Sequence, residues 1–306
     1  MIISLGEALI DFVSREGLTF EGFPGGSPYN TAIAISRLNT ECHFLGRVSN
    51  DLFGKQLIDY LKENSVSTDM IVTTEDKSTL SFVQKQDDGL VEYAFFANDT
   101  ADRNWKIDDF SHISIPGNAR IIHFGSISIS QEPCGTQLFS FLKKLAGKIL
   151  LSFDPNIRPS QVPDRDLYMK RFKTLCGISE IVKLSDEDLE WLYPGMESND
   201  ALKELRELGP SIIALTRGSE GAVILNKHHK VLVPILKQKV SDTIGAGDTF
   251  HGALLDYLYK KNWLSRESLD NLTIRELEAI GSYANKAAGL NCMKPGADPP
   301  TENEMR

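Results

Sequence analysis

Short apolar runs recur along this chain, and segments with the spacing of a helix separate most of them. The runs occupy residues 2–5, 70–73, 121–124, 149–153, 180–184, 212–215 and 222–225. Segments such as 136–147 and 200–209 repeat apolar residues three and four positions apart, which is the spacing of one helix face. This alternation of strand and helix predicts an α/β fold with a mainly parallel sheet that helices cover on both faces.

Small and polar residues follow five of these runs directly. They are Gly6-Glu7, Gly125-Ser126, "DPNIR" (154–158), "SDED" (185–188) and "TRGSEG" (216–221). The carboxyl ends of parallel strands meet at one edge of a sheet, and open α/β sheets bind their ligands at that edge. We therefore expect the functional site where these segments come together.

Two regions depart from the alternation. Residues 9–26 and 79–105 are rich in β-formers, and a "DDG" turn in the second region predicts a hairpin. No crossover helix follows either of them at once. They could form a small separate sheet that acts as a flap, or an antiparallel extension of the main sheet, and the pattern alone leaves both open.

Composition and charge exclude several classes of protein. The formal net charge is −9, from 33 basic and 42 acidic residues, which argues against nucleic acid as a partner. No apolar run approaches the roughly 20 residues of a membrane helix, and Glu7 and Asp11 come too early for a signal peptide. The four cysteines lie far apart without CxxC spacing, as reduced thiols in a cytoplasmic protein would.

The segment 241–259 contains the most specific local signal. After Asp248, apolar residues follow the spacing of a helix packed on a core: Phe250, Ala253, Leu254, Tyr257 and Leu258. Gly245, Ala246 and Gly247 then form the turn into that helix. The free N–H groups and the positive end of the helix dipole at such a turn favour an oxyanion.

Two familiar phosphate motifs do not fit this segment. A dinucleotide fingerprint needs a third glycine where Phe250 stands, and a Walker A loop needs Gly-Lys-Ser/Thr, which occurs nowhere in the chain. A dinucleotide-dependent oxidoreductase is therefore disfavoured.

Asp248 allows two interpretations. It could be a first-turn acid that complements the dipole, a stabilisation of about 0.3–1 kcal/mol, and on this residue alone that interpretation is favoured. Alternatively, the Gly245–Gly247 amides hold a transferring phosphoryl group while Asp248 orients an acceptor hydroxyl and takes its proton. The helix N-terminus is expected to lower the pKa of Asp248, which would keep it ionised at neutral pH.

Several motifs in a fixed order carry a resemblance that covers almost the full length. They are "GEALID" (6–11), "GGSPYNTAIAISRL" (25–38), "HFGSISIS" (123–130), "DPNIR" (154–158), "KLSDEDLEWL" (183–192), "LTRGSEGA" (215–222), "DTIGAGD" (242–248) and "ANKAAGLNCMKPGA" (284–297). As a set they resemble the ribokinase-like (phosphofructokinase-B) family of carbohydrate kinases, and most of all its fructokinases. The resemblance implies one ribokinase-like domain over 1–306, with a three-layer α/β/α core and a β-sheet lid from about 9–26 and 79–105.

The resemblance also implies ATP, Mg²⁺ and, as in some relatives, K⁺, and it assigns residues. Catalysis falls to Asp248 as base and to Gly245, Ala246 and Gly247 as anion hole. Substrate binding falls to Asp11, Gly25, Gly26, Ser27, Asn30, Tyr93, Phe95 and Arg158. Nucleotide binding falls to Asn156, Lys183, Thr216, Arg217, Gly218, Gly221, Asn285 and Ala288. Asp188 would hold the divalent ion through water, and Asp242 would lie at the monovalent ion.

Some of these assignments compete with simpler explanations. Many relatives carry Asn-x-x-Glu at the metal, whereas this chain has Ser185 and Asp188 at the matching positions. Ala288 and its neighbours could equally form a close helix-packing face, and aromatic residues on a hairpin such as Phe95 are more often lid core than sugar-stacking groups. Asp186 and Glu187 fit an acidic first helix turn.

The implied activity is transfer of the γ-phosphoryl group of ATP to a sugar hydroxyl, foremost D-fructose to fructose 6-phosphate. Acceptors that would use the same chemistry are 2-keto-3-deoxygluconate, ribose and a nucleoside. A non-catalytic regulator that binds sugar or nucleotide is a more distant alternative. The partners implied are thus small molecules, with a homodimer formed through the lid and neither nucleic acid nor membrane.

Overall fold

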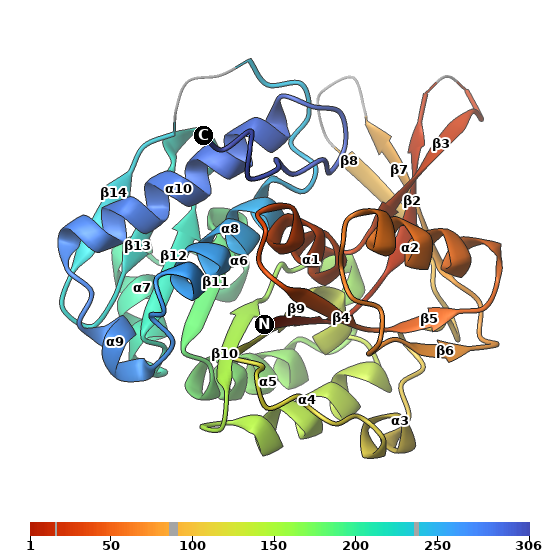
Figure 1. The fold of residues 1–306 in the computed structure, drawn as a ribbon, viewed down its shortest axis with the longest axis horizontal. Coiled ribbons are helices and arrows are strands. Elements are labelled where there is room, and N and C mark those ends of the chain that lie inside the picture. The colour runs from red at the N-terminus through yellow and green to blue at the C-terminus, as the bar shows by residue number, and fades with distance from the viewer. Residues whose placement is uncertain (16, 86–90, 236–238) are drawn as a thin grey trace.

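The computed structural model describes residues 1–15, 17–85, 91–235 and 239–306, and Figure 1 shows their arrangement. In this part of the chain the main sheet has eight strands, in the order β14-β13-β12-β11-β10-β9-β1-β4. Their bounds are β1 Ile2–Leu5, β4 Cys42–Leu45, β9 Ile121–Gly125, β10 Leu150–Asp154, β11 Ile181–Ser185, β12 Ile212–Thr216, β13 Ala222–Leu225 and β14 Lys230–Val233. All neighbours from β4 to β12 pair in parallel and the last two pairs are antiparallel, which confirms the mainly parallel sheet.

One expected strand lies elsewhere. The run 70–73 overlaps β6 (Val72–Thr74), which pairs with β5 (Arg47–Ser49) in a separate two-stranded sheet. One edge of the main sheet is instead formed by β4, in the segment "CHFL", whose histidine interrupts the apolar pattern.

Helices cover both faces of the main sheet (Figure 1). One face carries α1 (Ser27–Arg37), α8 (Ala246–Lys260), α9 (Arg266–Asp270) and α10 (Ile274–Cys292). The other carries α4 (Cys134–Leu145), α5 (Arg165–Ile178), α6 (Asp186–Leu192) and α7 (Ser198–Glu207). Successive strand residues alternate between the two cores, as Ile2 and Ile3 do, so the strands carry apolar side chains on both faces. No described helix is long and apolar enough to cross a bilayer.

The two β-prone regions form a second sheet at one end of the molecule, at the upper right of Figure 1. Its order is β3-β2-β7-β8, from β2 (Leu9–Ser14), β3 (Phe20–Gly25), β7 (Thr79–Lys85) and β8 (Val91–Phe96). The alternative of an extension of the main sheet is therefore wrong. The ring of Phe82 lies 5.2 Å from that of Phe12, 5.1 Å from that of Phe20 and 5.4 Å from that of Phe96, so aromatic contacts join all four strands. Helix α2 (Leu52–Glu63) packs against β2 and β3, and the short α3 (Ile107–Ser111) follows the second region.

The strand order reverses at β1. From β1 the chain adds β4 on one side and later returns to place β9 on the other. The loops after β1 and β9 therefore diverge and leave a crevice at the carboxyl edge. The backbone after β9 also comes very close to β10, because a side chain at Gly125 (φ 155°) would collide with the Asp154 carbonyl.

Candidate active site

Two pockets open at the carboxyl edge of the main sheet and meet each other. The first pocket lies beside the second sheet, the lid expected from the sequence, and we call it the lid-side pocket; its volume is about 350 Å³. The volume of the second pocket is about 460 Å³. Six residues line both: Asn156, Arg158, Lys183, Glu187, Thr243 and Gly247. We call this shared region the junction. Two ligands could thus lie with their reacting ends side by side.

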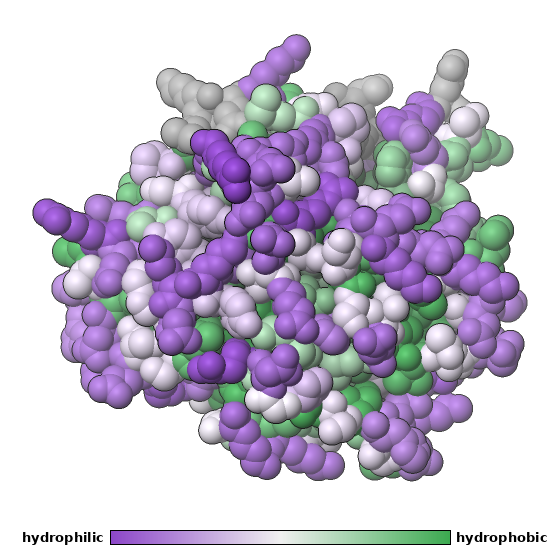
Figure 2. Space-filling model, in the orientation of Figure 1, coloured by the Kyte–Doolittle hydropathy of each residue, from purple (hydrophilic) through white to green (hydrophobic). Residues whose placement is uncertain are grey.

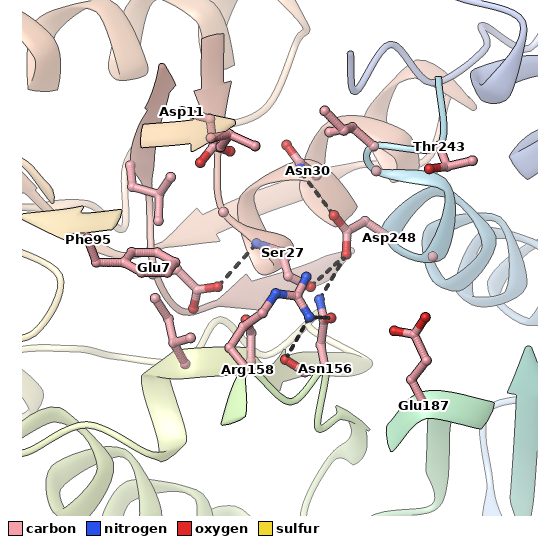
Figure 3. Close-up of a pocket in the computed structure, with 18 of the residues that line it drawn as sticks. Glu7, Asp11, Ser27, Asn30, Phe95, Asn156, Arg158, Glu187, Thr243 and Asp248 are labelled. Carbon is pink, nitrogen blue, oxygen red and sulfur yellow. Dashed lines mark hydrogen bonds between the residues drawn. The ribbon is translucent and has the colours of Figure 1, made fainter. Parts of the chain in front are cut away.

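The predicted substrate residues gather around the lid-side pocket, as Figure 3 shows. Those that line it are Asp11, Gly26, Ser27, Asn30, Phe95 and Arg158. Gly25 does not line the pocket, but a side chain at this position would collide with the Asp11 carboxylate, so the glycine leaves room for Asp11. The side chain of Tyr93 lies outside the described residues.

The second pocket collects most of the predicted nucleotide residues. Thr216, Gly218, Gly221, Asn285 and Ala288 line it, together with the apolar side chains of Ile235, Val240 and Phe250. Asn285 also donates hydrogen bonds to the carbonyls of Val233 (2.9 Å) and Pro234 (3.3 Å), which fixes α10 against the end of β14. Arg217 is not among the lining residues described, and its guanidinium pairs with Glu220.

Asp248 lies in the first turn of α8 at the lid-side pocket and is only 7% exposed. Its two carboxylate oxygens accept hydrogen bonds from the Ser27 hydroxyl (2.6 Å) and the Asn30 amide (2.9 Å), as drawn in Figure 3. Burial raises the pKa of Asp248, and these two hydrogen bonds oppose the shift without cancelling it. The expectation of a lowered pKa is wrong because desolvation of the carboxylate outweighs the helix dipole. A raised pKa makes Asp248 a better proton acceptor.

The glycine turn has the backbone that its sequence predicts. Gly245 is the residue before α8 and adopts the left-handed conformation (φ 72°), where a side chain would lie 2.6 Å from the Cβ of Ala297. The Ala246 N–H donates to the Thr243 carbonyl at 3.2 Å, so this amide is already engaged within the turn. Gly247 lies at the junction.

Positive side chains approach the junction from two strand ends. Lys183, at β11, is buried and its Nζ lies 3.0 Å from Asp154 Oδ2. Arg158 donates to Asn156 Oδ1 at 2.7 Å. Burial raises the pKa of Asp11 to about 6, against the opposing effects of Ser81 and Arg158. The two cations of the junction therefore lie beside the carboxylates of Asp154 and Asp11, an arrangement suited to a polyanionic ligand that carries its own metal ion.

The predicted metal residues differ in how available their oxygens are. Asp188 lines the second pocket, but its Oδ1 accepts the Ile157 N–H (2.6 Å) and its Oδ2 the Ser185 N–H (2.9 Å). Glu187, which the sequence analysis placed in an acidic first turn, lines both pockets, and its carboxylate faces the junction in Figure 3. Asp242 accepts N–H groups from Ile244 and Gly296, each at 3.2 Å.

Glu7 is a second residue of the site to which the sequence analysis gave no role. It lines the lid-side pocket, is 1% exposed, and accepts hydrogen bonds from the Ser128 hydroxyl and the Ser27 N–H (3.1 Å). Ser27 in turn donates to Asp248. An acidic residue directly after a buried strand was the available signal, but burial of its carboxylate depends on α1 and β9, which are distant in sequence.

Burial raises the pKa of Glu7 to about 7 against the opposing hydrogen bonds from Ser128 and Ser126. The folded state therefore holds this proton at pH values where the unfolded chain has lost it, and stability falls as pH rises from about 4.5 to 7. We expect the stability gained by Glu7→Gln over wild type to grow by about 2–3 kcal/mol between pH 5 and pH 8. Urea unfolding at both pH values measures it.

Glu276→Gln is the matched control, because Glu276 is an exposed helix-cap acid whose pKa is lowered by hydrogen bonds from Thr273. Its stability difference from wild type should not grow in favour of the variant over this interval. A pH-independent difference for Glu7→Gln would contradict the burial of an ionisable Glu7.

Residues 1–304 match the pfkB family of carbohydrate kinases. This chain belongs to that family. A fructokinase of Rhizobium leguminosarum bv. trifolii is 36% identical over 284 residues, covering 90% of this chain and 86% of that protein. Fructokinase-1 of Zea mays is 34% identical over 319 residues, covering 100% and 96%.

Solved structures agree with the assignment to the pfkB family. The crystal structure of a fructokinase with bound ATP from Xylella fastidiosa superposes with a TM-score of 0.89 at 26% identity, covering 99% of this chain and 96% of that one. An uncharacterised sugar kinase from Pyrococcus horikoshii in complex with ATP gives a TM-score of 0.83 at 29% identity. The resemblance read from the sequence motifs is thereby confirmed, and the protein is a carbohydrate kinase, a phosphotransferase with an alcohol group as acceptor.

Proposed function

We propose that this kinase transfers the γ-phosphoryl group of ATP to D-fructose, giving fructose 6-phosphate and ADP. The observation that carries the proposal is the place of Asp248, a buried carboxylate of the lid-side pocket. It directly follows Gly247 of the junction, where this polar pocket meets a partly apolar one. The relatives named fructokinase support fructose as the acceptor, and the ATP-bound neighbours support the nucleotide.

In this mechanism the sugar occupies the lid-side pocket. Asp11 and Asn30 offer acceptor and donor groups to neighbouring hydroxyls. The reacting hydroxyl lies at Asp248, whose raised pKa suits it to take the proton as the phosphorus–oxygen bond forms. Ser27 and Asn30 hold the carboxylate in one orientation, so that little rearrangement is needed during transfer.

The nucleotide occupies the second pocket, with its phosphates directed to the junction. Lys183 and Arg158 offset phosphate charge there. The amides of Gly245 and Gly247 receive the transferring group, since the Ala246 N–H donates to the Thr243 carbonyl. Thr216, Gly218 and Gly221 border the phosphates and ribose, and Asn285 and Ala288 line the adenine end. Arg217 can contact the nucleotide only if its ion pair with Glu220 is broken.

The carboxylates present fit a magnesium ion that arrives with ATP. Mg²⁺ usually binds phosphate oxygens, several waters and one or two carboxylates, and no cluster of three metal-ligating side chains exists among the described residues. Glu187 and, through water, Asp188 would hold the ion, and when bound it offsets charge on the phosphates. Asp242 and the backbone near Gly296 would border a monovalent cation.

We further propose that the second sheet is a lid that excludes water from the junction, and that two chains pair through it. Phe96 on β8 is 63% exposed, and Leu18, which lies between β2 and β3, is 92% exposed. Much of the face in Figure 2 is hydrophilic, and green side chains appear beside the lid strands at its upper right. Equilibrium sedimentation of wild type and Phe96→Glu tests the dimer, and a monomeric wild type would refute it. We place the protein in the cytoplasm, in keeping with its four free thiols; cell fractionation tests this.

The decisive experiment is a coupled ADP-release assay over a panel of sugars, each with Mg²⁺ and with excess EDTA. We expect the highest kcat/KM for D-fructose and loss of turnover with EDTA. Preference for 2-keto-3-deoxygluconate, ribose or a nucleoside would keep the chemistry and overturn the acceptor. Absence of turnover on every sugar, with binding retained, would favour the non-catalytic regulator.

A further inference from the structure

Polar side chains occupy a part of the core directly below the junction. His123 on β9 and Ser152 on β10 are partners across the sheet, and α8 brings His251 onto them. The two histidine rings meet edge to face with centroids 4.5 Å apart, and all three side chains are fully buried. Neither nitrogen of His123 has a hydrogen-bond partner among the described residues. Packing alone would favour apolar residues here, because burial of polar groups is unfavourable.

His251 connects this cluster to the junction through one carboxylate. Its Nε2 lies 2.7 Å from the Ser152 hydroxyl and its Nδ1 lies 3.6 Å from Asp154 Oδ2. The same Oδ2 lies 3.0 Å from Lys183 Nζ. A Cβ atom at Gly247 would lie 2.9 Å from Lys183 Nζ. The contacts that run from His251 through Asp154 to Lys183 therefore end at the glycine turn.

The charges of the three groups are complementary. Burial lowers the pKa of His251, so the ring is neutral. Burial by itself would raise the pKa of Asp154, but Lys183 and His251 keep this pKa below its ordinary value, and Asp154 is ionised. A neutral ring can accept the Ser152 hydroxyl at Nε2 and point Nδ1–H toward Asp154. At 3.6 Å the Asp154 contact is longer than a hydrogen bond, and Nδ1 has no other hydrogen-bond partner among the described residues. A buried ion pair needs such additional donors to its carboxylate, and the Asn156 N–H supplies another, at 3.2 Å.

We infer that His251 is a positioning residue, which through Asp154 holds the Lys183 ammonium at the junction where the nucleotide phosphates arrive. This inference rests on the proposed function for the place of the phosphates. The turn of α8 that carries His251 follows directly on Asp248. One helix therefore places the base and, through the Asp154–Lys183 pair, the cation.

Two substitutions separate this role from packing. The amide nitrogen of His251→Asn stands at the same distance along the side chain as Nδ1, so it can still donate toward Asp154. That of His251→Gln stands at the distance of Nε2, so it reaches Ser152 and loses the Asp154 contact. If His251 only fills space, the larger Gln variant should be the better substitute. If it positions Asp154, the Asn variant should be.

Isothermal titration calorimetry with ATP and with adenosine gives a readout that requires no sugar. We expect the ratio of ATP to adenosine affinity to fall about tenfold or more in His251→Gln, because loss of one hydrogen bond between charged groups lowers affinity by about that factor. In His251→Asn the ratio should stay near wild type. Where the wild type turns over, kcat should follow the same order while KM for the sugar is unchanged. Should the Gln variant not fold, His251→Leu replaces it with the same expectation.

A normal affinity ratio in both the Gln and Leu variants, or equal losses in Asn and Gln, would overturn the inference. Failure of the proposed function looks different. A wild type that binds ATP but phosphorylates no sugar leaves the calorimetric comparison intact, and a wild type with no preference for ATP over adenosine refutes both.

Discussion

Replacing Asp248 by Asn is expected to lower kcat by about 1,000-fold or more, the upper part of the range for loss of a general base. An amide has nearly the same shape as the carboxylate and can still interact with Ser27 and Asn30, but it cannot take a proton. ATP affinity should be retained, since the nucleotide occupies the other pocket. Steady-state kinetics and calorimetry with ATP measure the two quantities.

Asp256→Asn is a matched control for this substitution. Asp256 is a buried aspartate two turns later on α8, where it accepts hydrogen bonds from Thr40 (2.6 Å) and Tyr283 (2.9 Å), and it lines neither pocket. Its substitution should lower stability and leave kcat unchanged. An Asp248→Asn enzyme with wild-type kcat would remove Asp248 from its role as base.

Replacing Gly247 by Ala is expected to lower kcat by about 100-fold with little change in thermal stability, because misplacement of reacting groups by about 1 Å has an effect of that size. The new methyl group would lie 2.9 Å from Lys183 Nζ, which is the end of a flexible side chain. Lys183 would therefore shift and move its charge away from the position that we propose for the transferring phosphoryl group. Helix propensity favours Ala over Gly, so α8 itself should tolerate the change.

The control for Gly247→Ala is Gly117→Ala. Gly117 is exposed, and a side chain there meets no described atom within 4 Å. Both variants should melt close to wild type, and only Gly247→Ala should lose turnover. Equal turnover in the two would show that the transferring phosphoryl group does not pass Gly247.

Local patterns in the sequence were sufficient for most of the fold. Parallel strands are buried on both faces, so their apolar runs were visible, and the helix after Asp248 was visible from its spacing. The edge strand β4 was missed because His43 interrupts its apolar run, and 70–73 was misleading because an apolar run does not say which sheet it joins.

The site could be predicted only in part, for a related reason. Glycine turns and strand-end residues are local features, so Gly245 and Asn156 could be proposed from the sequence pattern, whereas Asn30 was assigned through the resemblance to the kinase family. The availability of a carboxylate is not local: Asp188 has both oxygens on backbone N–H groups, while its neighbour Glu187 faces the junction. Likewise, Arg217 was assigned from its motif but pairs with Glu220.

The sequence by itself determined the alternation of strands and helices, the turn before α8 and membership in a kinase family, because each depends on residues close in the chain or on motif order. Only the tertiary structure decided the ionisation of the site. Asp248 and Glu7 titrate above their ordinary range because helices and strands distant in sequence remove water from them, and desolvation is a property of the folded surroundings.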